Sequence, residues 1–203
     1  MIAVVDYGAG NLHSVQNALN YIGVENTITG EAQAIRRADK VILPGVGAFG
    51  DAMKSLEAAG LSEVVRDTVK EEKPLLGICL GLHLLFEESE ESPGIPGLGI
   101  LPGKIVKIPA RPQLKIPHIG WNSITLTKKS RILEDLPKEP FVYFVHSYYA
   151  KPQDPKVVSA TVEYGTELEI AVEAGNLFAT QFHPEKSGKT GLKILENFAR
   201  LEV

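Results

Sequence analysis

The sequence predicts an α/β protein with a doubly wound, mainly parallel sheet and an antiparallel, strand-rich extension in its carboxy-terminal half. Up to residue 86, short apolar segments alternate with segments whose apolar residues recur at helical spacing, which favours parallel strands joined by helices. Beyond residue 100, segments of alternating or β-branched character follow one another, as antiparallel strands do. The 203 residues, 44% of them apolar, can bury one sizeable core, and we expect a single domain over residues 1–203.

The first half of the chain has the pattern of successive strand–helix units. Residues 2–6 predict a buried strand, residues 7–11 a tight loop, and the helix that follows has an apolar face with Leu12 and Leu19. Gly23 should end this helix, because glycine favours the left-handed conformation at that position. The other elements expected here are strands at 24–29, 40–43 and 75–78 and helices at 31–38, 51–58 and 61–72. This order is typical of flavodoxin-like folds.

The second half begins with an acidic segment, residues 87–91, which we expect to be the solvated end of a helix. Residues 92–112 are rich in proline and glycine. Strands are then expected at 104–108, 119–126, 141–150, 157–164, 168–174 and 177–182. These segments form the predicted extension of the sheet.

Composition excludes several classes of function. A single cysteine, Cys79, excludes an internal disulfide and a cysteine-rich zinc site, and we predict no metal site. The net charge of −4 and the lack of a dense Lys/Arg block argue against nucleic acid as a partner. The longest nearly uninterrupted apolar run, residues 74–86, is too short to span a bilayer of about 30 Å. Because the chain opens directly into a strand without a cleavable leader, we expect a cytoplasmic protein.

Cys79 stands at the corner between a buried strand and a helix. Gly77 and Gly81 lie two residues before and after it, where they remove Cβ clashes between the two backbones, as in a nucleophile elbow. The free N–H groups at the start of the helix favour a thiolate and can bind a developing oxyanion. A lone cysteine is more often a small buried apolar residue, so a base elsewhere in the chain has to decide between the two interpretations.

A glycine-rich loop, residues 44–50, follows the strand at 40–43. It matches the pattern G-x-G-x-x-G between a strand and a helix, but we reject a dinucleotide site. The match lies in the third strand–helix turn instead of the first, and no acidic residue ends the next strand to hold a ribose. Since the loop shares a sheet edge with Cys79, it can aim backbone N–H groups at a substrate carbonyl.

The base is predicted in the segment His183-Pro184-Glu185, which follows the strand at 177–182. Pro184 restricts His183 to an extended conformation, and the Glu185 carboxylate can fold back towards the imidazole. An imidazole that takes the thiol proton, and a carboxylate that orients the imidazole, complete a nucleophile–base–orienter set. Together with the corner at Cys79, this segment predicts a catalytic triad of Cys79, His183 and Glu185.

These motifs resemble those of the class I, triad-type glutamine amidotransferases, and the resemblance covers nearly the whole chain. It rests on residues 77–81, 183–185 and 44–47. Within that family, segments 7–11, 44–50, 86–91, 120–122, 143–148 and 183–187 are most similar to the glutaminase subunits of imidazole glycerol phosphate synthases. The glutaminases of pyridoxal phosphate synthases are of similar length, but their Gly-Gly-Glu-Ser-Thr loop is replaced here by residues 44–48.

The resemblance implies hydrolysis of glutamine to glutamate and ammonia through a γ-glutamyl thioester on Cys79, without a cofactor. The ammonia would pass, shielded from solvent, to a (β/α)8 cyclase subunit, the partner in a heterodimer, which makes imidazole glycerol phosphate and aminoimidazole carboxamide ribotide in histidine biosynthesis. Motif positions imply three sets of residues. They are the oxyanion-hole N–H groups of Val46 and Leu80, the glutamine contacts Gly47, His83, Glu91, Ser147 and Tyr148, and the residues facing the cyclase or the ammonia exit, Asn11, Trp121, Tyr143 and Lys186.

One position departs from the family pattern. His83 lies four residues after the nucleophile, where glutamine is usual, and an imidazole cannot copy both ends of an amide. We therefore expect weaker binding of glutamine. His13, His118 and His146 lack metal-ligand spacing and are expected to be loop or packing residues. Three alternatives stay open: the glutaminase subunit of another amidotransferase, a cysteine hydrolase on a flavodoxin-like sheet, and a glutaminase-like binding subunit with weak turnover.

Overall fold

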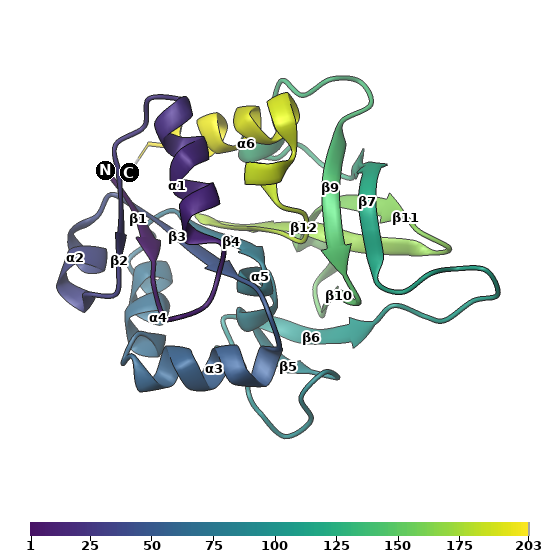
Figure 1. Ribbon diagram of the computed structural model, residues 1–203, viewed down its shortest axis with the longest axis horizontal. Coiled ribbons are helices and arrows are strands. Elements are labelled where there is room, and N and C mark those ends of the chain that lie inside the picture. Colours follow the sequence, from purple (N-terminus) through teal and green to yellow (C-terminus); the bar gives the residue numbers. More distant parts are fainter. Residues whose placement is uncertain (203) are drawn as a thin grey trace.

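The centre of the computed structural model, which describes residues 1–202, is a mixed sheet of eleven strands (Figure 1). The main order is β2-β1-β3-β4-β13-β12-β10-β6-β5, and β11 and β8 extend it beside β12. These strands are β1 (Ile2–Val5), β2 (Asn26–Thr29), β3 (Lys40–Gly45), β4 (Leu75–Cys79), β5 (Phe86–Ser89), β6 (Leu101–Lys107), β8 (Thr125–Leu126), β10 (Tyr148–Pro152), β11 (Val158–Glu163), β12 (Glu167–Ala174) and β13 (Leu177–Thr180). Neighbours from β2 to β13 pair in parallel, and those from β13 through β12 and β10 to β6 pair antiparallel. The predicted doubly wound sheet with an antiparallel extension is confirmed.

Helices cover both faces of this sheet, as a doubly wound fold requires (Figure 1). They are α1 (Leu12–Tyr21), α2 (Ala32–Arg37), α3 (Phe49–Ala58), α4 (Ser62–Lys70), α5 (Leu80–Leu84) and α6 (Gly188–Arg200), with short 3-10 turns η1 (Arg131–Leu133), η2 (Pro155–Val157) and η3 (Pro184–Lys186). α1 and α6 share one core, which includes Leu19 and Phe198, whereas α2, α3 and α4 share the other, which includes Leu56. A different set of helices therefore packs against each face of the sheet.

The end of α1 shows why glycine follows it. Gly23 has φ +72°, its N–H donates to the Asn20 carbonyl, and the Val24 N–H donates to the Leu19 carbonyl. This pair of bonds is a Schellman motif. Since Val24 still belongs to the helix cap, β2 begins at Asn26 and not at the predicted residue 24.

Two predicted strand segments divide in the structure. The segment predicted at 119–126 forms β7 (His118–Ser123) and β8, and the segment predicted at 141–150 forms β9 (Phe141–His146) and β10. β7 and β9 form a separate antiparallel pair, whereas β8 and β10 belong to the main sheet. The pair stands beside the extension (Figure 1). Val142 and Phe144 are buried in the core beneath α1 and α6, and Ile119 and Trp121 face outwards. Alternation along each strand thus gives the pair a buried face and an outer one.

Two other segments differ from the sequence prediction. The acidic segment is not a helix end, because Phe86–Ser89 forms β5 and pairs in parallel with β6. Burial of Phe86 and this pairing override the helical character of the glutamates. α6 was not predicted, because Gly188 and Gly191 at its start are typical of loops. A Cβ at Gly191 would lie 1.8 Å from the Pro184 carbonyl oxygen, so close packing against η3 requires glycine there.

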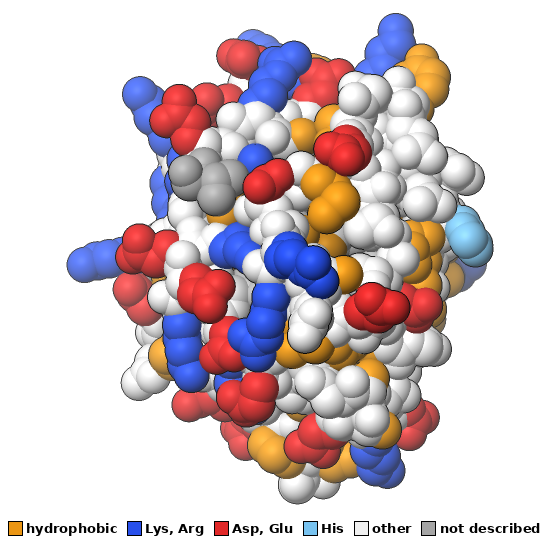
Figure 2. Space-filling view, turned by 90° about the vertical axis from the view of Figure 1, so that its left-hand side faces the viewer, with side chains coloured by type: hydrophobic (Ala, Val, Ile, Leu, Met, Phe, Trp, Pro, Cys, Tyr) orange, Lys and Arg blue, Asp and Glu red, His pale blue; other side chains and the backbone are white. Residues whose placement is uncertain are grey.

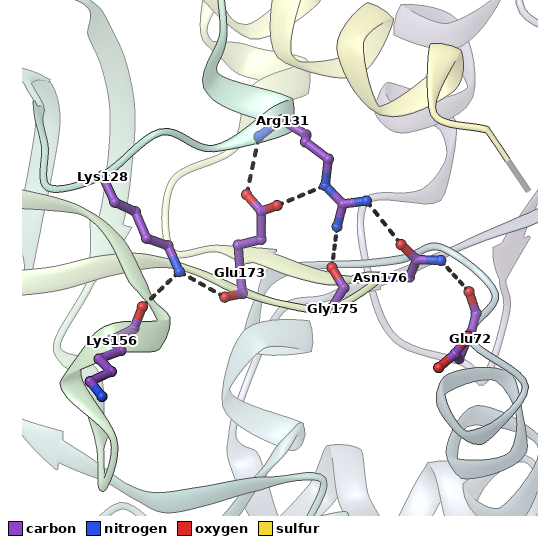
Figure 3. A network of polar contacts seen from close by, with 7 residues as sticks. All are labelled: Glu72, Lys128, Arg131, Lys156, Glu173, Gly175 and Asn176. Carbon is purple, nitrogen blue, oxygen red and sulfur yellow. Dashed lines mark hydrogen bonds and ion pairs between the residues drawn. The ribbon is translucent and has the colours of Figure 1, made fainter.

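A polar network holds together the starts of β4 and β13, the two strands that lead to the candidate site (Figure 3). The Asn176 carbonyl accepts from the Leu75 N–H at 3.0 Å, and the Asn176 side chain donates to the Glu72 carbonyl. Arg131 donates to the Glu173 carboxylate at 2.8 Å and also to Asn176 and to the Gly175 carbonyl. The network fixes both strands at the end remote from Cys79.

Acidic and basic side chains lie interspersed on the face of the molecule shown in Figure 2. None of the helices within residues 1–202 has the length and apolar character needed to cross a membrane. Across the same residues, His, Cys, Asp and Glu side chains form no group of three or more that could hold a metal ion.

Candidate active site

The chain turns sharply at Cys79, between β4 and α5. Cys79 has φ +56° and ψ −108°, a conformation that L-residues adopt only under constraint. A Cβ at Gly81 would lie 1.9 Å from the Leu43 carbonyl oxygen, and one at Gly77 would lie 3.0 Å from the Gly81 carbonyl oxygen. Both glycines are therefore needed for the close approach predicted from the sequence, and the corner has the geometry of a nucleophile elbow.

A cavity of about 380 Å³ opens at this corner. It brings together residues from both halves of the chain, which the parallel pairing of β3, β4 and β13 places at one sheet edge. Its lining consists of Val46, Gly47, Cys79, Leu80, His83, Glu91, Pro117, Val145, His146, Ser147, Tyr148, Gln181, His183 and Lys186. Ten of these lining residues are predicted site residues, namely Val46, Gly47, Cys79, Leu80, His83, Glu91, Ser147, Tyr148, His183 and Lys186.

His183 and Glu185 form a buried pair behind the cavity wall. The imidazole Nδ1 lies 2.8 Å from Glu185 Oε1, and both side chains are almost fully buried. His183 is extended, with φ −97° and ψ 100°, as expected before Pro184. Since Glu185 occupies Nδ1, the nitrogen left for proton exchange is Nε2, which is buried and has no hydrogen-bond partner within residues 1–202.

The charge state of His183 suits proton donation. Burial alone would lower the pKa of His183, but interactions with Cys79 and Glu185 outweigh burial and raise this pKa to about 9. At neutral pH the ring therefore carries a proton that it can give to a leaving group. Burial, with a smaller contribution from the charge of Cys79, also raises the pKa of Tyr7, so its phenol stays neutral.

Gln181 and His83 form a second polar pair beside the sulfur. Gln181 Nε2 lies 3.9 Å from Cys79 Sγ, and Gln181 Oε1 lies 2.7 Å from His83 Nε2. Burial lowers the pKa of His83 to about 4, although the bond to Gln181 acts in the opposite direction, so His83 is neutral. Sequence reasoning missed Gln181, because its role depends on a contact with a residue 98 positions away.

Side-chain hydrogen bonds hold the glycine-rich loop between β3 and α3. The Tyr7 hydroxyl donates to the Pro44 carbonyl at 2.9 Å. Glu91 Oε2 accepts from the Phe49 N–H at 2.9 Å and Ser92 Oγ from the Gly50 N–H at 3.0 Å. Glu91, predicted as a glutamine contact, thus lies at the cavity but also stabilises the start of α3.

Of the four residues predicted to face a partner, only Lys186 lines the cavity. Asn11 lies just before α1. Trp121 and Tyr143 are opposite each other on β7 and β9, with their rings 6.1 Å apart and edge to face. Trp121 is 55% exposed.

The remaining histidines divide between surface and core. His13 is exposed. His118 stacks on Phe144 and Tyr164 at ring distances of 4.6 and 3.9 Å, so its prediction as a packing residue is confirmed. His146 bonds to His118 at 3.0 Å and also lines the cavity, which its spacing in the sequence could not indicate.

The doubly wound sheet places Cys79 on a strained strand–helix corner, and a cavity joins this cysteine to His183 of the buried His–Glu pair. This arrangement is that of an α/β protein suited to nucleophilic cysteine chemistry. The sequence pattern of the glutamine amidotransferase class-I family matches residues 3–201, and the chain belongs to this family.

Curated relatives match along almost their whole length. The protein named "Imidazole glycerol phosphate synthase subunit HisH" from Methanothermobacter thermautotrophicus is 50% identical over 201 residues, which cover 99% of this chain and 98% of the relative. The protein of the same name from Aquifex aeolicus is 51% identical over 198 residues, which cover 97% and 95%.

Solved structures share the fold. A structure described as "Crystal structure of glutamine amidotransferase" has a TM-score of 0.76 and 23% identity and covers 98% of this chain and 99% of its own. PurLQS from Thermotoga maritima has a TM-score of 0.75 and 20% identity, with coverages of 97% and 96%. The predicted glutamine amidotransferase-like fold is therefore confirmed.

Proposed function

We propose that this chain is the glutaminase subunit of an imidazole glycerol phosphate synthase and supplies ammonia for histidine biosynthesis. The observation that carries the proposal is the cavity shared by Cys79 and His183, with Glu185 bonded to His183 from behind. Relatives about 50% identical over nearly the whole chain bear the name of this subunit. Both the site and the full-length similarity therefore support the same function.

In the proposed reaction, the Cys79 thiolate attacks the side-chain amide carbon of glutamine and forms a tetrahedral intermediate. The backbone N–H groups of Val46 and Leu80 stabilise its oxyanion. His183, protonated at neutral pH because its pKa is raised to about 9, gives its Nε2 proton to the departing ammonia. Water then attacks the γ-glutamyl thioester and gives a proton to His183, the general base, and collapse of the intermediate releases glutamate and restores the Cys79 thiolate and the protonated His183. Glu185 keeps the ring oriented and stabilises the imidazolium.

The glutamine would lie in the cavity, held by residues that line it. Gly47, His83, Glu91, Ser147 and Tyr148 all line the cavity that contains Cys79. A cavity of about 380 Å³ is in the range suited to a small amino acid. No step of this reaction calls for a cofactor.

The proposed partner is the cyclase subunit, in a cytoplasmic heterodimer. The outer face of β7 and β9 carries Ile119, Trp121, Phe141 and Val145, all exposed and apolar, which suits a protein interface. Val145 also lines the cavity, so the apolar face begins where the cavity opens. Ammonia released at Cys79 would then leave directly into the partner, past Lys186.

The free subunit should be nearly idle, because ammonia released without an acceptor is wasted. Val46 is 43% exposed and is followed by Gly47 at φ +98°, and a loop with such a glycine can rotate a peptide plane. We propose that partner binding brings the Val46 N–H into the oxyanion hole. The absence of one such donor lowers kcat by a factor on the order of 10² to 10³.

Steady-state release of glutamate tests this function, with the chain alone, with the cyclase, and with the cyclase bound to its nucleotide substrate. We expect strong stimulation in the last case. Cys79→Ala should abolish glutamine-dependent synthesis and leave ammonia-dependent synthesis by the complex intact. Full activity in isolation would favour a free-standing cysteine hydrolase, stimulation only by a different synthase would identify another amidotransferase, and binding of the cyclase without turnover would identify a binding subunit.

A further inference from the structure

Gln181 lies between the cavity cysteine and the residue that departs from the family pattern. Its amide nitrogen is 3.9 Å from Cys79 Sγ, and its amide oxygen is 2.7 Å from His83 Nε2. Gln181 and His83 are both buried. The three residues come from β4, α5 and the segment after β13, so the fold brings them together at the corner.

The chemistry of an amide sets the direction of both contacts. A carbonyl oxygen only accepts hydrogen bonds, so His83 Nε2 must carry a proton and donate it to Gln181 Oε1. The amide NH2 group is then directed at the sulfur, and a thiolate can accept from it. The opposite orientation would place a carbonyl oxygen against the negative sulfur, which is repulsive. The backbone of Gln181 is also fixed, because its N–H donates to the Ile170 carbonyl at 2.8 Å.

We propose that Gln181 is a positioning residue that stabilises the Cys79 thiolate, and that His83 acts through Gln181 by holding its amide in the donating orientation. The use of this thiolate in turnover rests on the proposed glutaminase function, but the contact itself does not. Nε2 of His83 is occupied by Gln181, and Nδ1 of His83 is buried without a hydrogen-bond partner within residues 1–202.

Other titratable groups surround the thiol. Tyr7, from the loop after β1, and His183 interact electrostatically with Cys79, and Glu185 is bonded to His183. His83 from α5, Glu91 from the segment after β5, His146 from β9 and Lys186 from the segment after β13 line the same cavity. A useful variant must therefore change the amide contact and leave these groups in place. Gln181→Met does so with little change in side-chain length.

Alkylation of the only cysteine by iodoacetamide, measured in the full chain as a function of pH, tests the proposal without glutamine or a partner. Gln181→Met should raise the pH midpoint of alkylation by about one unit, since a hydrogen bond to a charged group is lost. Below the midpoint the rate should fall about tenfold. Gln16→Met, the same chemical change on α1, should leave the profile unchanged.

Variants of His83 separate its action through Gln181 from packing. His83→Leu removes the donor and should raise the midpoint, whereas His83→Gln supplies an amide donor and should restore the wild-type value. Adding His83→Leu to Gln181→Met should produce no further shift.

An unchanged midpoint in folded Gln181→Met, or additive shifts in the double variant, would overturn the proposal. If Gln181→Met does not fold, the comparison of His83→Leu with His83→Gln decides alone, and equal midpoints in those two would overturn it. Shifted alkylation midpoints in a chain that releases no glutamate with any partner would instead contradict the proposed function and leave the Gln181 contact established.

Discussion

The backbone N–H of His183 donates a hydrogen bond of 3.1 Å to the backbone carbonyl of Tyr143. The Ser187 hydroxyl reinforces this link, because it accepts from the Tyr143 N–H at 3.0 Å and donates to the His183 carbonyl at 2.6 Å. Tyr143 belongs to β9, whose outer face is the proposed partner surface. A displacement of β9 on docking would therefore reach the segment that carries His183 directly.

Replacement of Glu185 by glutamine should lower both the pKa of His183 and the rate of glutamine hydrolysis. The neutral amide cannot supply the negative charge that helps to raise this pKa to about 9, so the NMR titration of the His183 ring should move to lower pH. In a comparable triad, loss of the orienting carboxylate reduces kcat by a factor of about 10⁴. Asp39→Gln at the exposed amino-terminal ion pair is the control. An unchanged ring titration would contradict the role of Glu185.

Much of this site could be predicted from local sequence. The corner at Cys79 is recognisable because its steric demand falls on Gly77 and Gly81, two residues away on each side. The extended His183 is likewise dictated by its neighbour, Pro184. Both features depend on contacts between residues that are close in the chain, so the sequence spacing determines their geometry.

Other features depend on contacts between distant segments, which spacing alone does not reveal. β5 forms because Phe86–Ser89 pairs with β6, and α6 begins with glycines that its packing against η3 requires. Gln181 is bonded to His83 and Ser187 to Tyr143, and both partners lie far away in the chain. Unless the strand topology is known, nothing in the sequence around these side chains marks them as part of the site.

Replacement of His83 by glutamine should lower the apparent KM for glutamine and change kcat less. The amide restores the residue usual at this position in the family and offers a donor and an acceptor, whereas Nε2 of His83 is bonded to Gln181 and Nδ1 is buried. A selective fall in KM is the sign of improved uniform binding. Steady-state kinetics of the complex measure it, with Gln16→Met as the control. A KM that stays the same or rises would indicate a structural role at this position.

A methyl group at Gly45 should displace the proposed oxyanion loop. The added Cβ would lie 2.7 Å from Tyr7 Oη, 2.9 Å from Leu80 Cβ and 3.0 Å from the Gly81 nitrogen. Because this moves the Val46 N–H, kcat should fall by a factor on the order of 10² to 10³. Gly60→Ala, at an open turn between α3 and α4, is the control for general destabilisation. Full kcat in Gly45→Ala would argue against a donor from this loop.

Replacement of Trp121 by alanine should weaken cyclase binding without affecting Cys79. Trp121 lies near the centre of the exposed apolar face of β7 and β9, and a central tryptophan often contributes at least about 2 kcal/mol to an interface, or roughly 30-fold in Kd. Calorimetry with the cyclase measures Kd, and alkylation verifies the site. Tyr21→Ala removes an aromatic ring that is 80% exposed at the end of α1 and is the matched control. Equal effects of the two variants would place the interface elsewhere.

The hydroxyl of Ser187 should be needed for communication between the partner and the site. Ser187→Ala leaves the outer face of β9 unchanged but removes both bonds between Tyr143 and the His183 carbonyl. Since each of these two hydrogen bonds contributes about 1 kcal/mol, the stimulation of glutamate release by ligand-bound cyclase should fall by at least about tenfold, at unchanged Kd. Ser62→Ala removes a buried hydroxyl with no hydrogen-bond partner within residues 1–202 and should preserve stimulation. If Ser187→Ala is stimulated as strongly as the wild type, the signal must reach the cavity by another route, with the loop at 44–50 as the next segment to test.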